Sequence, residues 1–122
     1  MGSITRFEDL DAWKQALDLS VSIYRITKKF PSSEIYSLTN QMQRASSSIS
    51  ANIAEGFSRY GTKEKLQFYR IAAGSLTELK SFCYLSQKIG FLNQEELARL
   101  IDAIEVTHKL INALIRSIKE RP

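Results

Sequence analysis

The segment QMQRASSSISANIAEG, Gln41 to Gly56, decides the fold, because its apolar residues recur at the spacing of one helix face. These residues are Met42, Ala45, Ile49 and Ile53. Most of the other positions are small, and serine is a poor helix former because its hydroxyl competes for backbone hydrogen bonds. We therefore expect close packing by neighbouring elements to hold this helix. Gly56 is expected to end it in the left-handed conformation that glycine adopts most easily.

Composition indicates one globular domain covering residues 1–122, which is long enough for a real core. The chain is 43% hydrophobic and 25% charged, as is typical of soluble proteins. No apolar run approaches the roughly 18 residues of a membrane span, and the first residues lack the apolar centre of a signal peptide. Cys83 is the only cysteine, which excludes an internal disulfide and suits a reducing compartment. We therefore expect a cytoplasmic protein.

Three further helices flank the central one. The first is expected from Asp9 or Asp11 to about Lys29, before Pro31. The third is expected from Lys63 to Ile89, with Thr62 as its cap and Gly90 as its stop. The fourth begins after Asn93, since Glu96 completes the spacing of a capping box, and its apolar face continues to Ile118. For the second helix, Ser33 or Ser37 is the candidate N-cap. Short connections then predict an all-α, antiparallel up-and-down four-helix bundle.

Two of these helices carry a second apolar stripe. On the first helix one stripe comprises Leu10, Trp13, Leu17, Val21 and Tyr24, and the other Ala12, Ala16, Leu19, Ile23, Ile26 and Phe30. On the third helix one comprises Leu66, Tyr69, Ala72, Ala73, Leu76, Leu79 and Cys83, and the other Phe68, Ile71, Phe82, Leu85 and Ile89. A single stripe suffices for a helix at a monomer surface. Doubled stripes indicate burial against a second side or another subunit, and the sequence leaves open which stripe is core.

The residues for catalysis are scarce. His108 is the only histidine, and Cys83 lies on an apolar stripe, where a buried structural thiol is the better interpretation. One histidine and one cysteine are too few for a zinc site, and the glycine motifs that bind phosphate are missing from the sequence. We therefore expect neither a metal, nor a cofactor, nor an enzyme.

Several polar residues are spaced so that some of them lie beside the apolar faces of the second and third helices. They are Gln41, Arg44, Asn52, Glu55 and Glu78. Arg44, Glu55 and Glu78 are expected to face inward, where a charge must be paired and hydrogen-bonded. One interpretation is a structural network that joins the two helices, within the chain or at a subunit contact, and the other is a site for a bound group. We favour the network.

Basic residues gather where the third helix starts and the fourth ends, and we call this region the basic end. Its members are Arg59, Lys63, Lys65, Arg70, Arg116 and Lys119, with Tyr60 and Tyr69 interleaved. Converging cations bind phosphates, and exposed tyrosines stack on unpaired bases. The net charge of +4 is only a mild bias towards polyanions, and Glu64 and Glu120 interrupt the cluster. A nucleic-acid surface and a merely solvated end remain alternatives.

The sequence resembles a bacterial four-helix-bundle family that includes the intervening-sequence proteins encoded within large-subunit ribosomal RNA genes. The same superfamily includes the accessory protein of diversity-generating retroelements. The resemblance covers nearly the whole chain and rests on these features: Phe7 to Trp13, Phe30-Pro31, Gln41-x-x-Arg44-Ala45, Ser48, Asn52 to Gly56, Lys65, Phe68, Ala73 to Leu76, Glu78 and Gly90.

The resemblance implies a four-helix bundle that assembles as a homopentamer with a basic surface. In the retroelement branch it also implies binding to a reverse transcriptase and to nucleic acid. We therefore expect a non-enzymatic oligomeric scaffold that binds RNA or DNA. The alternative is a protein-interaction adaptor without nucleic-acid contact. A membrane partner is not expected, because acids and bases are mixed along the helices.

Overall fold

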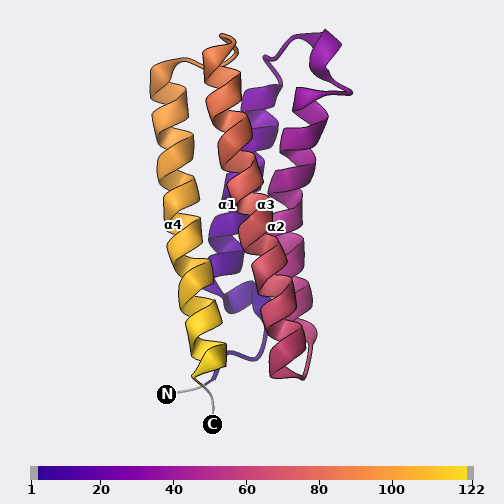
Figure 1. Cartoon of the computed structure of the whole chain (residues 1–122), viewed down its shortest axis with the longest axis vertical. Coiled ribbons are helices and arrows are strands. Elements are labelled where there is room, and N and C mark those ends of the chain that lie inside the picture. Colours follow the sequence, from indigo (N-terminus) through magenta and orange to yellow (C-terminus); the bar gives the residue numbers. More distant parts are fainter. Residues whose placement is uncertain (1–2, 121–122) are drawn as a thin grey trace.

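The structure is a computed structural model that describes residues 3–120, and it is an antiparallel four-helix bundle. The helices are α1 (Asp11–Thr27), α2 (Leu38–Ser58), α3 (Thr62–Lys88) and α4 (Gln94–Lys119). Two short 3₁₀ turns, η1 (Phe7–Asp9) and η2 (Ser32–Glu34), precede α1 and α2. Successive helices run up and down (Figure 1), so the all-α fold predicted from the sequence is confirmed.

Each helix packs against two others. α2 and α4 both contact α1 and α3, which places α1 and α3 on one diagonal of the bundle and α2 and α4 on the other. Because successive helices run in opposite directions, the end of α2, the start of α3 and the end of α4 lie at the same end of the bundle (Figure 1). α3 has 27 residues, so the two ends of the bundle are about 40 Å apart at 1.5 Å per residue.

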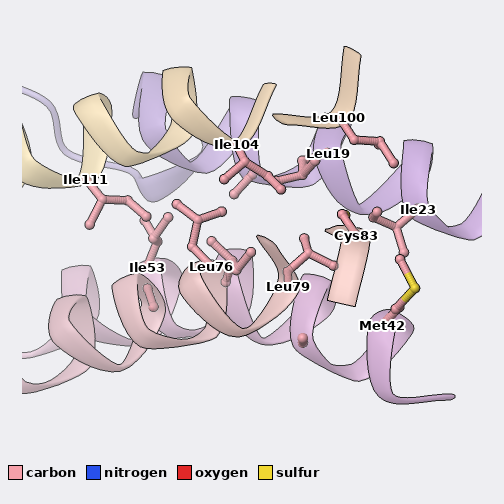
Figure 2. Close-up of a cluster of buried hydrophobic side chains, with 14 of the residues drawn as sticks. Leu19, Ile23, Met42, Ile53, Leu76, Leu79, Cys83, Leu100, Ile104 and Ile111 are labelled. Atoms are coloured by element: carbon pink, nitrogen blue, oxygen red, sulfur yellow. The ribbon is translucent and has the colours of Figure 1, made fainter. Parts of the chain in front are cut away.

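The core runs along the bundle axis and takes one stripe from each helix. Figure 2 shows part of it, with Leu19 and Ile23 of α1 facing Leu76, Leu79 and other side chains. The stripe of α1 that includes Ala16 and Ile23 is therefore the core stripe, as is the stripe of α3 that includes Leu76 and Cys83. Most of the second stripe on each helix remains outside this core.

The second stripe of α1 divides between the fold and the surface. Leu10 is buried and Trp13 packs edge-on against Phe7, so the start of this stripe fastens η1 to the bundle. Leu17, Val21 and Tyr24 are exposed. On α3, Ile71, Leu85 and Ile89 are exposed as well, so burial of both stripes does not occur within one chain.

The small residues of α2 allow its neighbours to approach closely, as the sequence predicts. The hydroxyls of Ser20 and Ser46 lie 3.3 Å apart between α1 and α2. Those of Ser48 and Ser75 lie 2.9 Å apart between α2 and α3. These hydrogen bonds join helices at points where larger side chains would separate them, which offsets the poor helix propensity of serine.

Two predicted helix boundaries are wrong. Gly56 does not end α2, which continues to Ser58, and Gly90 is the one glycine with a positive φ among residues 3–120. Gly56 instead lies against α3, where an added Cβ would come 2.7 Å from Tyr69 Cε1 and 3.0 Å from Phe68 Cβ. Thr62 is the first residue of α3 and not its cap, which is Gly61.

Three other boundary predictions have clear outcomes. Gly90 follows α3 with φ +90°, as expected of a helix stop. Asn93 forms the predicted capping box with Glu96, whose backbone N–H donates to Asn93 Oδ1 at 2.8 Å. Ser37 is the N-cap of α2 by position, but its side chain makes no capping hydrogen bond, and the N–H of Leu38 instead donates to Glu34 Oε1 at 3.4 Å.

Candidate nucleic-acid interface

The basic end lies where α2 ends, α3 begins and α4 ends (Figure 1). Lys63 and Arg70 are seven positions apart on α3, and Arg116 and Lys119 are three positions apart on α4, so each pair shares one helix face. All four side chains are exposed, and none has an ion-pair partner within residues 3–120. We call the basic side chains of Lys63, Arg70, Arg116 and Lys119 the four free bases, and this name never refers to nucleobases.

Arg59 is held by its own chain. Its guanidinium lies 2.9 Å from Glu55 and 3.9 Å from Glu64, and it stacks over the ring of Phe68 at 4.9 Å. Two carboxylates neutralise this cation, so a phosphate would have to displace them. Arg59 therefore fixes the α2–α3 connection, and its charge is less available than the sequence predicts.

Lys65 is also committed to an internal role. Its ammonium donates to the carbonyl oxygen of Phe57 at 2.8 Å and to that of Gly56 at 3.4 Å. These carbonyls belong to the last turn of α2, where the helix no longer continues to supply donors. The Gly56 carbonyl also accepts from the N–H of Arg59 at 3.2 Å. The ammonium also lies 5.3 Å from the centroid of the Phe57 ring. Lys65 thus caps α2 from α3, a role that helix periodicity does not reveal.

The two tyrosines of the basic end differ completely. Tyr60 lies in the α2–α3 connection and is fully exposed, as stacking on a base would require. Tyr69 is 0% exposed and belongs to the core beside Gly56, as its place on an apolar stripe indicates, so it is not available to stack on a base. It lies on the core stripe of α3, and its ring is buried there.

The structure adds acidic residues that the sequence analysis overlooked at this end. Because α1 starts where α3 starts, the first turns of the chain bring Glu8, Asp9 and Asp11 to the same end of the bundle (Figure 1). Glu8 pairs with Arg6 at 3.1 Å, and its own backbone hydrogen bonding together with Arg6 lowers the pKa of that carboxyl. Since α1 and α3 are diagonal, these carboxylates belong to the helix that does not contact α3.

The polar residues predicted to face inward lie on the surface. Arg44, Glu55 and Glu78 are all exposed, so the inward orientation expected of them is wrong for the single chain. Glu55 pairs with Arg59, while Gln41, Arg44 and Glu78 line a shallow recess of about 230 Å³ between α2 and α3. Ser48 and Ser75 also line it, and Asn52 Nδ2 donates to Ser48 Oγ at 3.0 Å. The motif therefore forms a polar surface with a hydrogen-bonded floor.

Burial makes Cys83 unreactive. Its side chain is enclosed in the core (Figure 2), and burial raises the pKa of the thiol to about 12. Within residues 3–120, no group of three or more His, Cys, Asp or Glu side chains is arranged to hold a metal ion. The same residues offer no helix able to cross a membrane.

The fold and its surface define a class of protein, the compact antiparallel four-helix bundle with cations at one end and exposed apolar stripes on two diagonal helices. The chain belongs to the 23S rRNA-intervening sequence protein family, whose model matches residues 8–113. The predicted family is therefore confirmed.

A solved structure shares this fold. It is the crystal structure of a protein with unknown function from the S23 ribosomal protein family of Bacteroides thetaiotaomicron, with a TM-score of 0.80. The similarity covers 86% of this chain and 95% of that chain at 19% sequence identity, which supports the fold alone. Comparison with curated proteins found no match.

Proposed function

We propose that this protein is a non-enzymatic, ring-forming scaffold of the cytoplasm that binds RNA or DNA through the four free bases. The observation that carries the proposal is that Lys63 and Arg70 of α3 and Arg116 and Lys119 of α4 belong to the same end of two contacting helices, each exposed and without an ionic partner in the described chain. Its family takes its name from an intervening sequence of 23S rRNA, which makes RNA the first ligand to test.

The exposed apolar residues support assembly. Leu17, Val21 and Tyr24 form a ridge on α1, and Ile71, Leu85 and Ile89 form a ridge on α3. Because α1 and α3 are diagonal, the two ridges face away from each other on opposite sides of the bundle. A contact between the α1 ridge of one copy and the α3 ridge of the next is head-to-tail. Such a contact generates a ring when the rotation between successive copies closes, and an open filament when it does not. The subunit number of five comes from the family resemblance.

The assembly is tested by light scattering on a sizing column. Val21→Glu or Leu85→Glu should each reduce the mass towards the 13.9 kDa of one chain, since a charge in an apolar interface is left unpaired. Val106→Glu is the matched control, because Val106 of α4 is 43% exposed, against 41% for Val21. A wild-type monomer would refute the ring. An equal effect of Val106→Glu would place the contact elsewhere.

Nucleic-acid binding is tested by the salt dependence of affinity for a single-stranded RNA. Replacing the four free bases by Gln should weaken binding and reduce the slope of log K against log salt by up to about 3 per subunit, at about 0.7 per phosphate contact. The control replaces Arg25, Lys88, Arg99 and Lys109 by Gln, which removes the same charge from exposed positions elsewhere. Equal losses in the two variants would mean that net charge, and not the four free bases, attracts RNA.

The alternative function is an adaptor that binds only proteins, and the apolar ridges favour it. A protein partner, such as the reverse transcriptase implied by the resemblance, would dock on ridge surface that copies of the chain leave uncovered. Apolar docking has a shallow salt dependence, whereas phosphate binding has a steep one. RNA affinity that is absent at low salt, in an intact assembly, would favour the adaptor.

A further inference from the structure

α1 ends and α2 begins at the end of the bundle opposite the basic end (Figure 1). A second recess is lined by residues of this region. We call it the end recess. It is formed by the last turn of α1, the η2 connection and the first turns of α2, and its volume is about 480 Å³. That volume falls within the roughly 300–1,000 Å³ of small-molecule sites. Neither the four free bases nor the apolar ridges contribute to it.

The end recess contains a buried hydroxyl without a hydrogen-bond partner. Thr39, one of its lining residues, is only 8% exposed, and its Oγ1 atom has no partner in the described chain. Most buried polar atoms are hydrogen-bonded, because an unpaired one has lost its water without compensation. A ligand that offers a donor or acceptor here would supply the missing partner after a rotation of the Thr39 side chain.

Two amide side chains stand beside this hydroxyl. Gln43 Nε2 donates to Thr27 Oγ1 at 3.1 Å, which fixes the side-chain amide. No hydrogen bond within residues 3–120 uses the side-chain oxygen, Oε1, of that amide. Asn40 is exposed on the same rim. Amides both donate and accept, so together with Thr39 they match the mixed edge of a nucleobase.

The remaining lining residues favour a flat, anionic ligand. Tyr36 is 93% exposed, so its ring presents a free face for stacking. Among residues 3–120, Lys28 is the only charged residue that lines the recess, and none of its lining residues there carries a carboxylate. Glu34 lies nearby in η2, and its Oε1 accepts from the N–H of Leu38 at 3.4 Å. An aromatic face, two amides and one cation without an acid suit a base that carries a phosphate better than a neutral sugar.

We propose that the end recess binds one unpaired nucleotide, with the base stacked on Tyr36, its edge hydrogen-bonded to Gln43 and Thr39, and its phosphate beside Lys28. Base stacking on an aromatic side chain and a single phosphate contact are the usual elements of single-strand recognition. This site lies about 40 Å from the basic end and goes beyond the function proposed above. A free mononucleotide can occupy it without contact with the four free bases.

The test is calorimetric titration of the full chain with adenosine and uridine monophosphates, each compared with ribose 5-phosphate and inorganic phosphate. Tyr36→Ala should weaken nucleotide binding about 5-fold to 150-fold, the loss typical of one stacked base. Gln43→Leu should weaken it as well. Tyr84→Ala is the matched control, since Tyr84 of α3 is exposed but does not line the end recess, and it should bind like the wild type.

Three results would overturn the proposal. Ribose 5-phosphate or phosphate binding as tightly as the nucleotides would leave an anion site at Lys28 without base recognition. Equal losses from Tyr36→Ala and Tyr84→Ala would mean that the nucleotide has no defined site at the end recess. No nucleotide binding by correctly folded wild-type protein would refute the site outright. The salt dependence of RNA binding at the four free bases is measured separately, so failure here does not decide that function.

Discussion

Replacing Gly56 with Ala should destabilise this protein, although the same change inside a helix normally stabilises. Gly56 lies within α2, where alanine is favoured by about 1 kcal/mol over glycine. Against this gain, the new Cβ would stand 2.7 and 2.9 Å from two ring atoms of Tyr69 and 3.0 Å from Phe68 Cβ. Tyr69 is completely buried, and a Cβ moves only with its backbone, so neither neighbour gives way easily. Overpacking of this kind costs about 1–3 kcal/mol.

We take the upper part of that range and expect a net loss of about 2 kcal/mol, or a fall of about 8 °C in Tm for a domain of this size. The assay is urea unfolding followed by circular dichroism at fixed protein concentration, because assembly would make stability depend on concentration. Gly74→Ala is the matched control. Gly74 is also helical, but an added Cβ there meets nothing within 4 Å, so that variant should gain up to about 1 kcal/mol.

The two alanine variants should therefore shift stability in opposite directions. Gly56→Ala as stable as the wild type, or more stable, would refute the close contact between α2 and α3. Gly56→Val should also lose stability, and the cause is the same close contact with Tyr69 and Phe68, because φ at Gly56 is not positive.

Three further predictions concern single side chains. Lys65→Met should cost about 1–2 kcal/mol, since the last carbonyls of α2 lose a charged donor, whereas Lys63→Met should stay within about 0.5 kcal/mol in the same urea assay; equal effects would refute the capping role. Asn93→Ala should cost about 1 kcal/mol by removing the capping box of α4, and an unchanged unfolding midpoint would contradict this. Cys83 should resist a thiol reagent at pH 8 until the chain unfolds, because burial raises the pKa of its thiol to about 12. Above its ordinary pKa of 9.0, the thiol ionises in the unfolded chain, while in the folded chain it keeps its proton. The free energy of unfolding should therefore fall between pH 9 and 12 more steeply in the wild type than in Cys83→Ala, by up to about 1.4 kcal/mol per pH unit.

The helices themselves could be read from the sequence, because the signals that define them are local. Apolar spacing located all four helices to within a few residues, and Gly90 and the Asn93–Glu96 pair marked two boundaries correctly. Each of these features depends on residues at most a few positions apart, and such distances are set by the geometry of one helix.

The candidate site was predicted only in part. The exposed positions of Lys63, Arg70, Arg116 and Lys119 follow from their places outside the core stripes. The inward orientation expected of Arg44, Glu55 and Glu78 was wrong, because periodicity places a residue beside an apolar face without saying whether another helix covers it. The end recess had no sequence signal, since it joins the end of α1 to the start of α2 across a turn.

The sequence by itself determined the four helices, their order and the two apolar stripes on α1 and α3. Only the tertiary structure decided which stripe is core, since that depends on which helices are neighbours and which are diagonal. It also decided that Gly56 serves a close approach to Tyr69, that Lys65 caps α2, and that Arg59 is neutralised by carboxylates. The reason is the same throughout: these roles arise from contacts between helices, and helix periodicity records the faces of a helix but not the partners that cover them.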